Sequence, residues 1–233
     1  MSSTPALFDR FERIVIISLP ERTDRRREMT EQLQKVGLDG DPRVRFFDAL
    51  KLPDAGRFGS IGANGCFKSH LSALRENRDR SVLLLEDDCD FTNDIFEAWL
   101  PEDFDILWGG YLEASDPDDL DASDLIGAHC IGFNAGRAAM VVDYLDDLLA
   151  DRIEHDPRAV KDANYDPDVL PPVDGAYVWF RRAHPELKTV FPDPQIAVQR
   201  PSRTDIGHLR FFDRLPGLRE AAEWARRVKR KLA

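Results

Sequence analysis

The chain has 233 residues, of which 42% are hydrophobic and 32% are charged, and its formal net charge is -11. This composition is typical of a soluble globular protein with one large domain, with or without appendages, and the acidic balance argues against nucleic-acid binding by the body of the protein. No apolar run approaches the ~20 residues that cross a membrane and none has the features of a signal peptide, so we expect a cytoplasmic protein.

The three cysteines, Cys66, Cys89 and Cys130, are odd in number and far apart, and none belongs to a CxxC pair. This pattern indicates neither a zinc site nor a disulfide framework. It favours a reducing compartment. We interpret Cys66 and Cys130 as small buried residues rather than nucleophiles.

We expect three parts in the chain: a loose N-terminus at residues 1–12, one domain at residues 13–212, and a basic helix at residues 213–233. Residues 13–19 are β-branched and apolar, which predicts the first buried strand. Residues 21–36 carry apolar side chains at helical spacing, which predicts a helix.

Four arginines crowd the start of that helix, where cations oppose the helix dipole. A functional interpretation is that one or two of them face a diphosphate. The alternative is a solvated basic face. The four are Arg22, Arg25, Arg26 and Arg27.

Val44–Asp48 is predicted to be the second strand, and the Gly- and Pro-rich residues 51–64 a loop. A helix is expected from Gly65 to about Asn77. Three polar side chains near its start could contact an anion, although a lone histidine is more often a structural hydrogen bonder. They are Lys68, Ser69 and His70.

An apolar run, residues 82–85, leads directly into four acids. The run predicts a central strand that is buried on both faces, and the carboxyl end of such a strand borders the ligand crevice of open α/β sheets. Acids this close repel each other unless a divalent cation lies between them. The alternative is a polar turn, in which Asp is common. The acids are Glu86, Asp87, Asp88 and Asp90.

Strands continue to alternate with helices after the acids, which predicts an α/β domain with a mostly parallel sheet. An acidic segment, residues 113–124, is expected to be a solvated, mobile loop that could act as a lid. Residues 151–172 are expected to be irregular. Further strands are predicted at 105–108, 129–133 and 188–191, and helices at 94–100 and 136–149.

The segment 215–233 carries six cations and two anions and has apolar side chains on one helical face. Such a helix can lie on the anionic inner face of the cytoplasmic membrane. It can equally dock on the domain.

Six motifs, taken in order, resemble glycosyltransferase family 25, the lipopolysaccharide-type galactosyltransferases related to procollagen galactosyltransferases. The similarity covers roughly residues 13–206, and the ordered set is more specific than any one motif. The motifs are IISLPERTDRR at 16–26, IGANGCFKSH at 61–70, LLLEDD at 83–88, FDILWG at 104–109, DGA at 174–176 and SRTDI at 202–206.

The resemblance implies a GT-A-like nucleotide-sugar-binding fold, an α/β fold whose mostly parallel central sheet is flanked by helices. It also implies a UDP-sugar donor, Mn²⁺ or Mg²⁺, and inversion at the anomeric carbon of the transferred hexose. Galactose is the hexose that we expect. The acceptor would be a hydroxyl of a cell-surface glycan such as lipopolysaccharide.

In that frame Asp88 would hold the metal and Glu86 would contact the ribose or a metal-bound water. Residues i and i+2 share a face of a strand, so Glu86 and Asp88 are expected to point into the crevice together and Asp87 away from it. Asp88 and Asp90 have the same spacing, which leaves the register open. His208 is either a further metal ligand or a surface residue.

For the donor, the resemblance implies a pocket beside the first strand, formed by Ser18, Arg22 and Arg26, together with Lys68, Ser69, His70, Glu86 and Asp87. Inversion in one step needs a base, and the candidate is Asp174, with Tyr177 and Trp179 able to stack on a sugar. The alternative is that Asp174 only caps a helix.

Two other functions stay open. A metal-dependent phosphohydrolase or nucleotidyltransferase could use the same acids, but such enzymes usually draw carboxylates from several strand ends or add histidines. A non-catalytic nucleotide-sugar or glycan-binding module would bind the donor without turnover.

Overall fold

The computed structural model describes residues 4–201. Three sequence predictions lie outside these residues: the metal ligand His208, the motif at 202–206 and the basic helix at 213–233. Within the described part of the chain, no helix is both long and apolar enough to cross a membrane.

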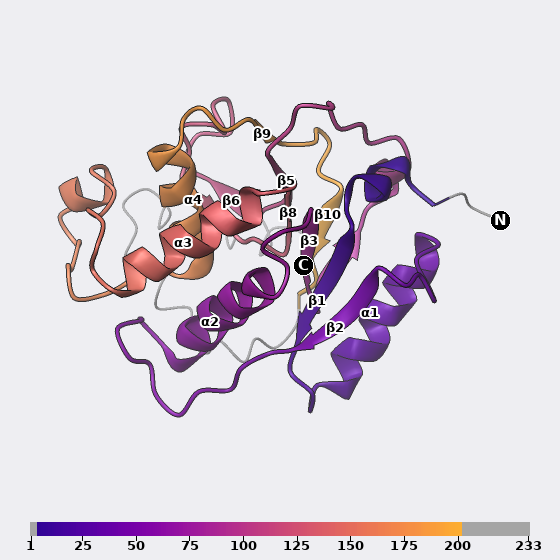
Figure 1. Ribbon diagram of the computed structural model, residues 1–233, viewed down its shortest axis with the longest axis horizontal. Coiled ribbons are helices and arrows are strands. Elements are labelled where there is room, and N and C mark those ends of the chain that lie inside the picture. Colours follow the sequence, from indigo (N-terminus) through magenta and orange to yellow (C-terminus); the bar gives the residue numbers. More distant parts are fainter. Residues whose placement is uncertain (1–3, 202–233) are drawn as a thin grey trace, which may run out of the picture.

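A six-stranded sheet forms the centre of the molecule, in the order β2-β1-β3-β8-β5-β9 (Figure 1). β1 runs parallel to β2 and β3, and β5 runs parallel to β9. β8 is antiparallel to both of its neighbours. The predicted mostly parallel α/β sheet is therefore confirmed. The strands are β1 (Arg13–Ser18), β2 (Val44–Asp48), β3 (Val82–Glu86), β5 (Ile106–Gly110), β8 (Cys130–Phe133) and β9 (Thr189–Val190).

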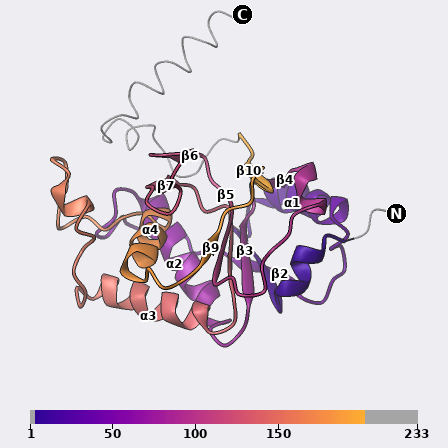
Figure 2. The same cartoon turned by 90° about the horizontal axis from the view of Figure 1, so that it is seen from above.

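Helices cover both faces of this sheet (Figures 1 and 2). On one face lie α2 (Ile61–Arg75), α3 (Arg137–Leu149) and α4 (Val173–Ala183), and on the other lies α1 (Thr23–Lys35). The strand β3 shows why the sheet needs both layers: Val82 and Leu84 pack into the core under α2, whereas Leu83 and Leu85 pack into the core under α1. Side chains alternate between the faces, so an unbroken apolar run fits only a strand that is covered on both sides.

The helix α2 begins four residues before its predicted start. Ser60 is its N-cap, and the Ser60 hydroxyl accepts a hydrogen bond of 3.0 Å from the Ala63 N–H. A serine N-cap satisfies a backbone donor that the first turn leaves unpaired. Lys68, Ser69 and His70 therefore lie in the middle of the helix, and the prediction that they surround its N-terminus is wrong.

Short strands complete the described structure. β4 (Cys89–Phe91) pairs with β10 (Ala197–Gln199), and β6 (Glu113–Ala114) pairs with β7 (Leu125–Ile126), all antiparallel. The acidic segment predicted as a mobile loop, residues 113–124, begins with β6 and ends directly before β7. Backbone carbonyls of its Leu120, Asp121 and Ala122 accept hydrogen bonds from arginines, which are Arg158, Arg181 and Arg182.

The N-terminus differs from its prediction. Ala6–Arg10 forms a 3-10 helix, and Leu7, Phe8 and Phe11 are buried against the core under α1. Burial of three large apolar side chains holds residues 6–11 on the domain, which the expectation of a loose segment missed. Further 3-10 helices lie at Asn93–Phe96, where a short helix was expected, and at Ala159–Lys161.

Candidate functional site

One edge of the sheet brings together the ends of several strands. β1 and β3 are parallel, and Ile17 lies opposite Glu86, so both strands end at this edge. β8 runs the other way and begins there, directly after His129. The carboxyl edge of an α/β sheet is where ligands usually bind.

The acids at this edge contact two different helices: Glu86 contacts α2, whereas Asp87 and Asp88 contact α1. β3 ends at Glu86, whose carboxylate lies 3.4 Å from His70 Nε2 under α2. Asp87 and Asp88 belong to the following turn, and both contact Arg25 of α1, at 2.8 and 3.3 Å. The expected arrangement, with Glu86 and Asp88 on one face and Asp87 on the other, is wrong because the strand alternation stops at Glu86.

Among these acids, Asp88 combines burial with incomplete hydrogen bonding of its carboxylate. Its side chain is buried, and Oδ2 accepts a 3.2 Å hydrogen bond from Gln199. The buried Oδ1 has no hydrogen-bond partner in the part of the chain that the structure describes. Burial, and then the negative charge of Glu86, raises the pKa of Asp88 to about 7. A buried carboxylate with an unpaired oxygen destabilises the fold unless a cation or a proton neutralises it.

Asp90 is already paired. It lies on β4, and both of its carboxylate oxygens accept hydrogen bonds from Arg200. Arg200 also contacts Glu28 of α1 at 2.6 Å. Asp88 is therefore better placed than Asp90 to take a cation, although the register of the metal pair stays a prediction.

Asp88 should make the stability of the metal-free protein depend on pH. Its folded pKa of about 7 lies above its ordinary value of 3.8, so between these pH values the folded state binds a proton that the unfolded state does not. Stability should therefore fall as pH rises from about 4 to about 7 and level off above that. We expect Asp88→Asn to exceed wild type by at least ~1 kcal/mol at pH 8, and by less at pH 6, in urea unfolding with EDTA.

His129, whose pKa is lowered by burial, acts in the opposite sense below its ordinary pKa of 6.5. It is present in both proteins, so it cancels in their difference. An equal difference between the two proteins at pH 6 and pH 8 would contradict the account.

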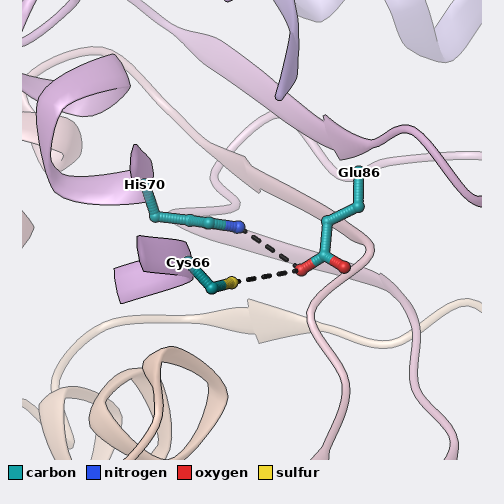
Figure 3. Close-up of side chains that lie close together, drawn as sticks. All are labelled: Cys66, His70 and Glu86. Carbon is teal, nitrogen blue, oxygen red and sulfur yellow. Dashed lines mark hydrogen bonds and ion pairs between the residues drawn. The ribbon is translucent and has the colours of Figure 1, made fainter. Parts of the chain in front are cut away.

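Glu86 also belongs to a group of three neighbouring side chains, together with Cys66 and His70 (Figure 3). Cys66 Sγ lies 4.0 Å from Glu86 Oε1, and His70 lies between Glu86 and Tyr177, whose hydroxyl is 3.1 Å from His70 Nδ1. Burial raises the pKa of the Cys66 thiol well above its usual range, and His70 lowers the pKa of Glu86 against the opposing effect of burial.

Ser69 and Lys68, the neighbours of His70, do not join these side chains in any described contact. Ser69 is buried, and its hydroxyl donates to the Gly65 carbonyl at 2.6 Å and accepts from the Leu50 N–H at 2.8 Å. These bonds give Ser69 a structural role between α2 and the preceding loop. A donor-binding role for Lys68 and Ser69 stays a prediction.

The arginine cluster of α1 separates into different partners. Arg26 donates to the Ser18 carbonyl at 2.9 Å and pairs with Asp48, and Arg22 pairs with Asp24 at 3.0 Å. Ser18 and Arg26 are therefore adjacent, and a donor pocket formed by Ser18, Arg22 and Arg26 stays a prediction.

Arg25, which was not chosen as a site residue, is the arginine that reaches the acids after β3. A sequence signal for it exists. Arg25 lies four residues before Met29, which is four residues before Leu33, and both of these are buried toward the sheet. Residues spaced by four share a helix face, so Arg25 continues the face that meets the sheet.

Asp174 lies in the first turn of α4, two residues after the N-cap Pro172. Its Oδ2 accepts a 2.8 Å hydrogen bond from the Gly127 N–H, and its Oδ1 accepts one of 2.9 Å from the Gly175 N–H. The pKa of Asp174 is raised by burial, against these hydrogen bonds. Asp174 is thus not the N-cap, and it links α4 to the turn after β7.

His129 is a residue of this edge that sequence reasoning did not select. It is fully buried, and within the described residues neither ring nitrogen makes a hydrogen bond of regular geometry. Its backbone carbonyl accepts a 3.0 Å hydrogen bond from the Glu86 N–H. No local pattern identified it, because its position depends on the pairing of β8 with β3.

Two hollows lie away from these acids. One of about 760 Å³ is lined by residues that include Arg158, Arg181 and Lys188. Another, of about 610 Å³, is lined by residues that include His155 and Tyr165. Neither is lined by the acids after β3, so the chemistry of the side chains, and not cavity size, identifies the candidate site.

No family model matches the chain, and no curated protein matches it. A crystal structure of a glycosyltransferase involved in the glycosylation of the major capsid of PBCV-1 is similar, with 10% sequence identity, a TM-score of 0.47, and coverage of 82% of this chain and 93% of that chain. The resemblance to glycosyltransferase family 25 therefore rests on the sequence motifs alone.

Proposed function

We propose that the protein is a metal-dependent, inverting glycosyltransferase. It would move a hexose, which we expect to be galactose, from a UDP-sugar to a hydroxyl of a cell-surface glycan such as lipopolysaccharide. The ordered motifs support the family. The observation that carries the proposal is the buried Oδ1 of Asp88 at the carboxyl edge of the central sheet, which has no hydrogen-bond partner among the described residues.

The residues at this edge fit a hard divalent cation such as Mn²⁺ or Mg²⁺. Asp88 supplies an oxygen to which no group in residues 4–201 forms a hydrogen bond, and Asp87 is the adjacent carboxylate. Oxygen ligands are the ones these cations prefer. When bound, the metal would supply positive charge to the diphosphate of the donor. His208 lies outside the described residues and stays a candidate ligand.

Side chains around Asp88 would bind and orient the donor. Arg25 contacts Asp87 and Asp88, so its guanidinium lies where a diphosphate beside these acids would need positive charge. Ser18 and Arg26 would face the nucleotide from the end of β1. Glu86 would contact the ribose, held in place by His70.

Asp174 is the proposed base. As the acceptor oxygen forms its bond to the anomeric carbon, the bond from that carbon to the diphosphate oxygen breaks, and UDP leaves with the electron pair. The acceptor proton passes to the Asp174 carboxylate. Its raised pKa suits this role, because a base is most effective when its pKa lies closer to the working pH.

A thermal-shift screen of nucleotide sugars tests the donor assignment. We expect UDP-galactose to raise the melting temperature with Mn²⁺ present, because a ligand that binds only the folded state stabilises it. The shift should be lost with EDTA. UDP-glucose and GDP-mannose serve as donor controls, and equal shifts with and without metal, or a shift only with GDP-mannose, would contradict the proposal.

A further inference from the structure

Next to the acids after β3 lie three side chains of types that can bind a metal ion, Cys66, His70 and Glu86 (Figure 3). One ligand atom from each lies within 4.8 Å of the other two. Cys66 and His70 are four residues apart on one face of α2, and Glu86 ends β3. Regular elements hold all three, so the group does not depend on a loop.

We propose that Cys66, His70 and Glu86 bind a thiophilic divalent cation of the zinc class. A thiolate, an imidazole and a carboxylate are all zinc ligands. Mn²⁺ and Mg²⁺ prefer oxygen ligands instead, so they would favour Asp88 over this group. The proposed ion is thus distinct from the metal at Asp88, although its ligands Glu86 and His70 also belong to the proposed donor site.

The distances fit such an ion. Tetrahedral zinc, with bonds of about 2.3 Å to sulfur and about 2.0 Å to nitrogen and oxygen, places its ligand atoms roughly 3.3–3.6 Å apart. His70 Nε2 and Glu86 Oε1 are already 3.4 Å apart. Cys66 Sγ, at 4.0 Å from Glu86 Oε1, would need to move by about half an ångström.

The hydrogen-bonding pattern of His70 gives an independent reason to propose a cation at this group. The His70 side chain is fully buried, Nε2 lies 3.4 Å from Glu86 Oε1, and within residues 4–201 Nε2 has no hydrogen bond of regular geometry. Nδ1 lies 3.1 Å from the Tyr177 hydroxyl. Without metal, the attraction between His70 and Glu86 lowers the pKa of Glu86 against the opposing effect of burial; with metal, Nδ1–H would donate to Tyr177 and the lone pair of Nε2 would bind the cation. A partner on the other ring nitrogen is typical of a histidine that binds metal.

An open coordination position remains for water or a ligand. The side chain of Glu86 is 22% exposed, whereas that of His70 is 0% exposed. Three protein ligands and one open position are the arrangement of catalytic rather than structural zinc sites.

The test uses Co²⁺, a spectroscopic substitute for zinc, on the metal-free full-length protein with excess Mg²⁺. We expect one Co²⁺ per chain, with a thiolate-to-cobalt charge-transfer band. Cys66→Ser should lose the band and bind Co²⁺ at least ~10-fold more weakly. Cys130→Ala, which removes a buried thiol outside the group, should keep the band.

A wild-type protein without the band, or a Cys66→Ser variant that keeps it, would overturn the proposal. X-ray absorption of the zinc-loaded wild type needs no variant, and it should show one sulfur at about 2.3 Å. A shell of nitrogen and oxygen only would also overturn it, and would leave His70 and Glu86 as a simple ion pair. Asp88→Asn should keep the cobalt band, so failure of the proposed glycosyl transfer can be recognised separately.

Discussion

Asp88→Asn should lower metal-dependent cleavage of the UDP-sugar by at least ~100-fold, because it removes the negative charge that would hold the cation. The amide is similar in size to the carboxylate, so the fold should persist. The variant should even be more stable than the metal-free wild type at pH 8, since the buried charge is gone. The measurement is the rate of UDP release at saturating Mn²⁺, with far-UV circular dichroism to confirm folding.

Asp90→Asn is the matched control for this prediction. Asp90 carries the same charge two residues further on, but Arg200 already occupies its carboxylate. We expect this variant to keep activity within ~10-fold of wild type. A larger loss in Asp90→Asn than in Asp88→Asn would assign the metal to Asp90 and contradict the site described above.

Gly110→Ala should destabilise the protein by at least ~2 kcal/mol. A Cβ at Gly110 would overlap the Ala197 carbonyl oxygen and His129 Nε2. The first of these is backbone, which cannot rotate away. The change would push β10 from β5, and β10 carries Gln199, the hydrogen-bond donor to Asp88. Urea unfolding measures the loss, and UDP release should fall in parallel.

Gly59→Ala is the control for that substitution. A Cβ at Gly59 meets nothing within 4 Å, so its stability should stay within ~0.5 kcal/mol of wild type. A Gly110→Ala protein as stable as Gly59→Ala would show that β10 does not pack closely against the end of β5.

The elements with strong periodicity could be predicted from the sequence. β1 and β3 are unbroken apolar runs, and α3 has a continuous apolar face, so each was recognised within a few residues of its ends. β4 and β10 could not be recognised, because each has three residues and finds its partner more than 100 residues away. Such short strands carry no periodic signal of their own.

The sequence pointed to the acids after β3 as the candidate site, but not to the residues that pack against them. The acids after β3 were identified because the charge follows an apolar run. Their directions were wrong, because strand alternation was extended into a turn. Arg25 was named with three neighbouring arginines but not preferred among them, and its contact with the acids depends on packing between α1 and the sheet. His129 was not named, because its place depends on the pairing of β8 with β3.

UDP release from UDP-galactose by the wild-type protein is the most direct test of glycosyl transfer at Asp88. The assay contains Mn²⁺ and an acceptor glycan, and EDTA is added during the reaction. We expect steady release of UDP that stops when EDTA is added and resumes when excess Mn²⁺ is restored. Release that continues unchanged through the addition of EDTA would contradict it.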